Sequence, residues 1–186
     1  APYLDQLTSR YGGSGTPSGF STWTGAGYSC NVSGGPSTVI EVPAGNWLID
    51  CSNLTVNRPV IFQGGDVIAD GDIDLGADGA LAINTNKTGS FPYTSASSDA
   101  VLYMRDGEIR KAGGASLLFH NTLVYLSGTS DIAMQGGTGT VVWVAPTSGN
   151  FEDLALWSDA ATTHGFAGQA SLDLEGVFFA PWARIS

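Results

Sequence analysis

Short apolar runs, each ended by turn-forming residues, restrict the fold of this chain more than any other feature. Seven such runs lie in its first half, at residues 39–42, 47–50, 54–56, 60–62, 67–68, 73–75 and 81–83. Runs of this length between Gly, Pro, Asn and Asp are typical of β-strands. Because too few residues separate them for a connecting helix, the sequence predicts an all-β fold.

The composition excludes several other classes of protein. Only 13% of the residues are charged, against about 25% in typical globular proteins, so a helical bundle rich in charged helix formers is not expected. The 42% of hydrophobic residues argues against intrinsic disorder. Seven Lys and Arg residues oppose 17 Asp and Glu residues, for a net charge of −10, and form no basic patch for nucleic acid. No apolar run approaches the roughly 20 residues of a membrane span.

The chain also repeats itself. Residues 128–136 match residues 168–176 at an offset of 40, and residues 72–83 can be laid on residues 131–142 at an offset of 59. These offsets are close to multiples of about 20 residues, the length of one coil in many solenoids. Units that cannot bury their own apolar face and that repeat in this way favour a parallel β-solenoid, or β-helix, for which we expect the commoner right-handed form. A β-sandwich has similar strand spacing and stays the competing architecture.

Composition divides the chain into two segments. Residues 1–38 contain the Gly-, Ser- and Thr-rich stretch 11–19, and only residues 3–7 are able to form a helical turn or two. This segment is predicted to be an N-terminal cap or linker. Residues 39–186 are predicted to form the β-solenoid domain.

The chain contains two cysteines, Cys30 and Cys51. Two cysteines are too few for a zinc site, which needs about four ligands. We expect a disulfide between them, and a disulfide is typical of exported proteins. Two buried free thiols in a cytosolic protein are the alternative.

A series of acidic residues is the sharpest grouping of chemistry-bearing side chains: Asp66, Asp70, Asp72, Asp74 and Asp78. Strand alternation directs Ile73 and Leu75 toward the core and Asp70, Asp72 and Asp74 toward the outside. Carboxylate oxygens suit calcium, so these three aspartates are the candidate metal ligands, and calcium is the one cofactor considered. The alternative is a solvated acidic surface that resists aggregation.

The sequence gives enzyme chemistry little support. The same carboxylates with Arg58 or Arg105 imitate the sites of polysaccharide-degrading solenoids, but neither arginine stands in a readable register with them. His120 and His164 have no partner at metal-binding spacing, and the Gly-x-Ser-x-Gly nucleophile motif is missing. We therefore expect no catalytic residue.

The C-terminal third carries a characteristic order of strands and turns, in the segments 123–128, 132–136, 141–149, 154–159 and 166–181. A strand ending in Ala-Pro-Thr-Ser-Gly precedes an apolar strand with an Asp turn, and a Gly-bounded strand then leads to a final aromatic-Ala-Pro strand. This region resembles the surface β-solenoid region of TadG-like and minor-pilin-like proteins of bacterial tight-adherence and type IV pilus systems. The resemblance implies a structural or adhesive role in a pilus or other surface filament, with no catalytic residue to carry over.

The sequence thus predicts a non-enzymatic extracellular protein that associates with itself or with other pilus or surface-filament subunits. A solenoid that binds or degrades a surface polysaccharide is the alternative function. Aromatic residues that could stack on sugars are expected to pack in the core or at the end of the solenoid: Phe119, Trp143, Trp157, Phe178 and Phe179.

Overall fold

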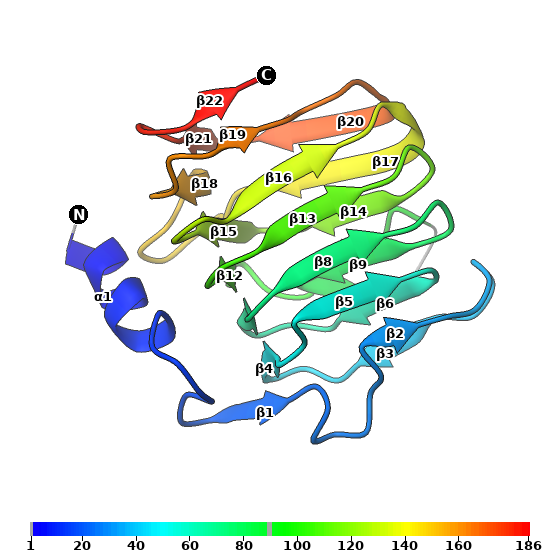
Figure 1. Ribbon diagram of the computed structural model, residues 1–186, viewed down its shortest axis with the longest axis horizontal. Coiled ribbons are helices and arrows are strands. Elements are labelled where there is room, and N and C mark those ends of the chain that lie inside the picture. The colour runs from blue at the N-terminus through cyan, green and yellow to red at the C-terminus, as the bar shows by residue number, and fades with distance from the viewer. Residues whose placement is uncertain (1, 89–90) are drawn as a thin grey trace.

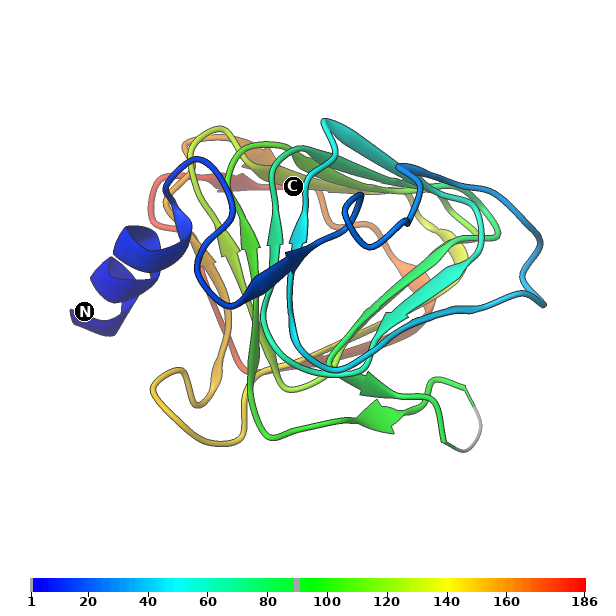
Figure 2. The ribbon, with the colours of Figure 1, turned by 90° about the horizontal axis from the view of Figure 1, so that it is seen from below.

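The computed structural model describes residues 2–88 and 91–186 as a parallel β-helix with a short N-terminal helix (Figure 1). Three parallel sheets, here called A, B and C, form its sides, and the coils from β1 to β17 pass through them in that order. Figure 2 shows the three sides around a roughly triangular core. The predicted solenoid is confirmed, and a β-sandwich is excluded because neighbouring strands within these three sheets are parallel.

Sheet A contains β1 (Phe20–Thr22), β4 (Asn46–Ile49), β7 (Val67–Ala69), β12 (Ala100–Met104), β15 (Thr122–Leu126), β18 (Leu154–Ser158) and β21 (Val177–Phe179). Sheet B contains β2 (Asn31–Val32), β5 (Asn53–Val56), β8 (Asp72–Leu75), β13 (Glu108–Lys111) and β16 (Asp131–Met134). Sheet C contains β3 (Ile40–Val42), β6 (Pro59–Phe62), β9 (Ala80–Ile83), β14 (Ser116–Phe119), β17 (Gly137–Val144) and β20 (Gln169–Glu175).

Two smaller strand pairs complete the fold. At the C-terminal end, β19 (Thr163–His164) pairs with β22 (Arg184–Ile185). A bridge between Ala133 of β16 and Gly165 joins this pair to side B. The antiparallel hairpin of β10 (Thr85–Asn86) and β11 (Thr94–Ser95) interrupts the chain between β9 and β12, and it projects from the triangle in Figure 2.

The solenoid begins earlier than the sequence indicated. Strand β1 pairs with β4 and β2 pairs with β5, so the first coil starts at Phe20, within the segment 1–38 that was predicted to be a cap or linker. These strands have only three and two residues. Strands so short, between Gly, Ser and Pro, show too little alternation to be recognised.

Coil length changes along the chain. Leu48 pairs with Ile68, 20 residues later, as the repeat predicted, whereas Val67 pairs with Leu102 because the hairpin enlarges that coil. The offset of 59 corresponds to a true register, since Asp72 and Asp131 both align with Glu108. The offset of 40 does not, because it matches β16 on side B with β20 on side C.

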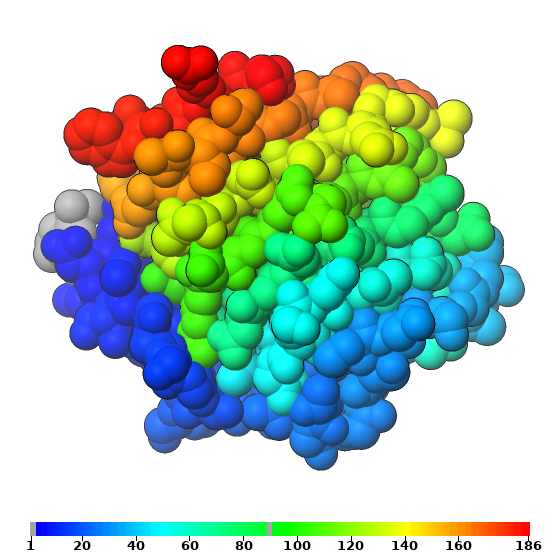
Figure 3. Space-filling view, viewed as in Figure 1, coloured from blue at the N-terminus to red at the C-terminus, as the bar shows by residue number. Residues whose placement is uncertain are grey.

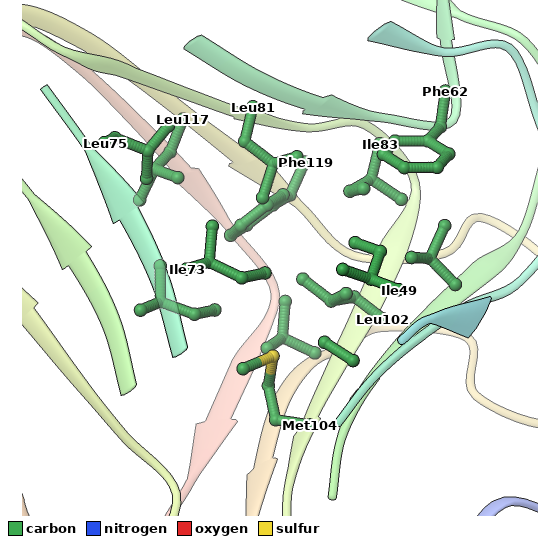
Figure 4. Close-up of a cluster of buried hydrophobic side chains, with 14 of the residues drawn as sticks. Ile49, Phe62, Ile73, Leu75, Leu81, Ile83, Leu102, Met104, Leu117 and Phe119 are labelled. Carbon is green, nitrogen blue, oxygen red and sulfur yellow. The ribbon is translucent and has the colours of Figure 1, made fainter. Parts of the chain in front are cut away.

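Inward-facing side chains from all three sheets fill the core (Figure 4). Its buried members come from successive coils, among them Ile49, Phe62, Ile73, Leu81, Leu102 and Phe119. At the N-terminal end the core is closed by Trp23, which is fully buried, stacks on Tyr28 with ring centroids 4.4 Å apart, and donates its indole N–H to the carbonyl of Ser29 at 2.9 Å. The predicted Cys30–Cys51 disulfide is confirmed and ties the first coil to the second.

Helix α1 (Pro2–Tyr11) lies against a side of the solenoid and does not close its end (Figure 2). Its buried residues Leu4, Leu7 and Tyr11 pack on outward-facing side chains of sheet A, including Tyr103 and Tyr125. In the space-filling view, the coils follow one another as stacked bands from the N-terminal to the C-terminal end (Figure 3).

Candidate functional site

The predicted acidic residues of β8 lie on the outer surface of side B, where arginine binds them. Arg110, one coil further along on β13, places Nη2 2.6 Å from Asp72 and Nη1 2.8 Å from Asp74. Its Nε bonds to Glu108. Asp70 lies at the preceding corner and pairs with Arg105 at 2.7 Å. The predicted outward orientation is therefore confirmed, and each of the three carboxylates has a cationic partner.

This arrangement gives the calcium prediction no geometric support. Within residues 2–88 and 91–186, no group of three or more His, Cys, Asp or Glu side chains is placed to hold a metal ion. Asp70, Asp72 and Asp74 are instead paired with Arg105 and Arg110 at the surface. Calcium binding at these residues stays a prediction, which a chelator titration would test.

The acidic surface of side B contains carboxylates that the sequence did not indicate. Asp131 of β16 follows Glu108 and Asp72 in register. Partial burial raises the pKa of the Asp131 carboxyl, and the negative charges of Glu108 and Asp72 raise it further. The positive charge of Arg110 thus reduces the electrostatic repulsion among these carboxylates. Sequence reasoning missed it because the hairpin between β9 and β12 conceals the register between β8 and β13.

The two histidines are buried, as expected of structural residues. His164 Nε2 lies 2.9 Å from Ser158 Oγ, and its Nδ1 has no hydrogen-bond partner among the described residues. His120 Nε2 lies 3.1 Å from the carbonyl oxygen of Pro92. Burial lowers the pKa of both imidazoles. The Ser158–His164 pair is completely enclosed, so a substrate has no access to it.

A shallow groove runs along the outer surface of side C near the hairpin. It has a volume of about 320 Å³, and its lining includes Pro36, Pro59, Asp78, Phe91 and Tyr93. The rings of Phe91 and Tyr93 meet edge to face, with centroids 5.6 Å apart. The aromatic pair can contact the apolar face of a sugar, and the Asp78 carboxylate can accept hydrogen bonds from the sugar hydroxyls.

Unpaired strand edges and exposed apolar side chains lie together at the C-terminal end of the described solenoid. Strands β20, β21 and β22 are the last strands of their sheets, so each presents an unpaired backbone edge there. Core-facing positions continue into this end: Leu172 aligns with buried Val141, and Leu174 with buried Trp143. In β20, the last described strand of sheet C, they are 52% and 45% exposed.

Exposed apolar residues are concentrated at this end. Eight large hydrophobic side chains are exposed among the described residues, and six of them belong to the last 15 residues of the chain. We call these six the end patch: Leu172, Leu174, Val177, Phe179, Trp182 and Ile185. Apolar patches of several hundred Å² usually mark interaction sites.

Comparisons of the chain with protein families, with curated proteins and with solved structures gave no match. None of the described helices has the length and apolar character that crossing a membrane requires.

The two ends of the solenoid therefore differ in chemistry. Both ends leave strand edges, at β1, β2 and β3 and at β20, β21 and β22. Trp23 and Tyr28 cover the core at the N-terminal end, whereas the end patch is exposed at the other. Three charged side chains of the last strands, Asp173, Glu175 and Arg184, take part in none of the ion pairs of residues 2–88 and 91–186. The C-terminal end is accordingly the candidate functional site. The aromatic residues predicted to pack in the core or at the end of the solenoid divide here: Phe119 and Trp143 are core, whereas Phe179 is exposed and stacks on Trp157.

Proposed function

We propose that this chain is a non-enzymatic structural or adhesive component of a bacterial pilus or other surface filament, located outside the cell. The observation that carries the proposal is the contrast between its surfaces. The carboxylates that could serve catalysis are held by Arg105 and Arg110. The strand edges at both ends of the described solenoid are unpaired, and another polypeptide can add strands there.

The fold supports a mechanical role. Stacked coils share a continuous core and parallel backbone hydrogen bonds, and such solenoids are stiff and extend by addition of further coils. A disulfide within the first two coils is consistent with an oxidising compartment. Addition of strands to a free sheet edge is a common mode of subunit recognition. The resemblance of residues 123–183 to surface solenoids of pilus systems agrees with these features.

The proposal is tested by electron microscopy of surface material from the native cells, with antibodies against this chain. We expect the antibody to label filaments along their length or at their tips, and Asp72→Ala to leave the labelling unchanged. A chain distributed over cells without any filament, or absent from their surface, would contradict the proposal.

The groove at Phe91 and Tyr93 favours a second candidate function, which is binding of a surface polysaccharide. If the groove binds sugar, Tyr93→Ala should abolish binding on a glycan array, while Tyr3→Ala, an exposed tyrosine outside the groove, should retain it. Loss of substrate turnover in Asp72→Ala would instead indicate a polysaccharide-degrading enzyme.

A further inference from the structure

We propose that a small cleft between helix α1 and side A binds a free amino acid, whose carboxylate contacts Arg10 and whose ammonium group contacts Asp99. The cleft lies beside β7 and β12, in the middle of sheet A and away from both ends of the solenoid. This inference goes beyond the proposed structural role and does not rest on it. Binding is tested on the purified chain without any filament, so either proposal can fail alone.

Three segments that are far apart in the sequence form the cleft. Helix α1 supplies one wall, the residues at the starts of β7 and β12 supply another, and the loop before β18 supplies the third. The lining includes the buried side chains Leu7, Tyr11 and Val101, together with Phe151 and the exposed ring of Tyr3. The volume of about 180 Å³ is below the roughly 300–1,000 Å³ of sites for drug-sized ligands. The ligand is therefore a small molecule with an apolar part.

Hydrogen bonds hold the walls of the cleft together in the absence of a ligand. Asp66 accepts one from the hydroxyl of Tyr11 on α1 and one from the backbone N–H of Val101 on β12, the latter at 2.9 Å. Arg105 Nε donates to the carbonyl of Tyr11 at 2.7 Å. The site is thus preformed, which reduces the entropy lost on binding. Because both oxygens of Asp66 already accept hydrogen bonds, this carboxylate is not the main contact for a ligand cation.

Two other charged groups of the lining have no charged partner. Arg10 and Asp99 both line the cleft, yet neither belongs to any ion pair of the described chain, residues 2–88 and 91–186. The Arg10 guanidinium lies over the ring of Tyr11, 5.1 Å from its centroid. A guanidinium stacked in this way still directs its N–H groups outward in its own plane, where a carboxylate can accept two of them. One small cleft therefore offers an available cation and an available anion.

These two charges decide the class of ligand. An inorganic anion would leave Asp99 without a partner, and a simple cation would leave Arg10 without one. A free amino acid carries both charges, so it can form a charge-assisted hydrogen bond at each group. The apolar lining around Leu7 and Val101 then contacts the ligand side chain, and burial of that side chain adds to the affinity. Amino acids with an apolar side chain fit the cleft best.

Such a ligand would also join α1 to the solenoid. Arg10 belongs to the helix, whereas Asp99 precedes β12. A ligand that contacts both binds only the docked arrangement and stabilises it by mass action. Binding is therefore expected to slow hydrogen exchange in α1, which gives a readout besides affinity.

A nuclear magnetic resonance titration of the purified chain tests the inference. The probes are L-leucine and L-phenylalanine, with leucinamide, which lacks the carboxylate, and N-acetylleucine, which lacks the ammonium group. We expect saturable shifts of amide signals from the cleft, such as those of Arg10, Val101 and Phe151, with at least one of the two amino acids. Both derivatives are expected to bind about 10-fold more weakly or worse, because each loses one charge-assisted contact.

Two variants assign the contacts. Arg10→Gln is expected to remove the preference for leucine over leucinamide, and Asp99→Asn to remove the preference for leucine over N-acetylleucine. Both residues are exposed, so the fold should persist, and the spectrum of each variant shows whether it does. The matched controls are Arg184→Gln and Asp173→Asn, which change exposed residues outside the cleft and should bind like the wild type.

Three results would overturn the inference. The first is the absence of saturable shifts in the cleft with either amino acid at millimolar concentration. The second is equal affinity for leucine and its two derivatives. The third is a loss of binding in the control variants as large as that in Arg10→Gln and Asp99→Asn.

Discussion

At the scale of single residues, the outer surface is organised by a few charged and hydroxyl side chains that reach from one coil to the next. Arg110 joins the carboxylates of β8 and β13 on side B. At one corner of the coils, Asp106 accepts hydrogen bonds from the backbone N–H and the hydroxyl of Thr129. Apart from the Arg110–Glu108 pair, these contacts link positions more than 20 residues apart, so local sequence patterns do not reveal them.

Replacing the shared cation tests the organisation of side B. Arg110→Gln leaves Asp72, Asp74 and Glu108 without their partner, and we expect a loss of stability of about 1 kcal/mol at low ionic strength, toward the upper limit for exposed ion pairs. High salt should reduce the loss because it screens the carboxylates. The control is Lys87→Gln, which removes a single exposed pair with Glu41. Urea unfolding at two salt concentrations measures both, and equal losses for the two variants would contradict the expectation.

The Asp106 corner makes a pH-dependent contribution. The hydrogen bonds from Thr129, of which the hydroxyl is the stronger cause, lower the pKa of Asp106 in the folded protein. A folded-state pKa below the unfolded value of about 3.9 means that this stabilisation is present above that pH and is lost as the pH falls through the folded pKa. We expect Asp106→Asn to be less stable than the wild type at neutral pH, with the difference vanishing in acid. A difference that is constant with pH would contradict this.

At the scale of elements, the sequence did not predict where α1 packs on the solenoid. Residues 3–7 were predicted to be capable of a helical turn, and the structure extends the helix over Pro2–Tyr11 and places it beside sheet A. Tyr11 donates its hydroxyl to Asp66, and Arg105 Nε donates to the Tyr11 carbonyl at 2.7 Å. Because these partners lie far along the chain, the docking site of the helix could not be predicted.

Docking of α1 should be separable from the solenoid. Leu7 is buried in the contact with sheet A, so Leu7→Ala is expected to cost about 2–5 kcal/mol of docking free energy. Since the helix lies outside the triangle, the coils should stay folded. Hydrogen exchange should show loss of protection in α1 while the core strands stay protected, and exposed Gln6→Ala on the same helix serves as the control. Global unfolding of Leu7→Ala would show that α1 is required for the solenoid.

At the scale of the whole molecule, the regular early coils explain how much of the fold could be predicted. The seven apolar runs coincide with β3 to β9 because their coils have nearly equal length and few insertions. The first coil was missed because its strands are too short, and the later register was concealed by the hairpin and by long loops. The candidate site could not be recognised at all, since Leu172 and Leu174 have the same pattern as buried residues of inner coils.

The difference between the two ends predicts unequal effects of truncation there. In dilute solution, Trp23→Ala should cost about 3–5 kcal/mol, because it opens a cavity at the closed end. Leu172→Ala should cost less than about 1 kcal/mol, because half of its surface already contacts water. Urea unfolding measures both variants. A loss for Leu172→Ala as large as that for Trp23→Ala would show that the C-terminal end is also covered.

The placement of α1 outside sheet A also determines how such rods behave when they lie side by side. A neighbour that approaches side A meets the helix, and one that approaches side C meets the hairpin, where Tyr93 packs over the outward-facing residues of that sheet. Side B presents Asp72, Glu108 and Asp131 in a row, which repels the same row on another copy. Contact between side B of one rod and side B of another is thus disfavoured. Rods crowded on a surface would therefore turn their acidic sides away from one another.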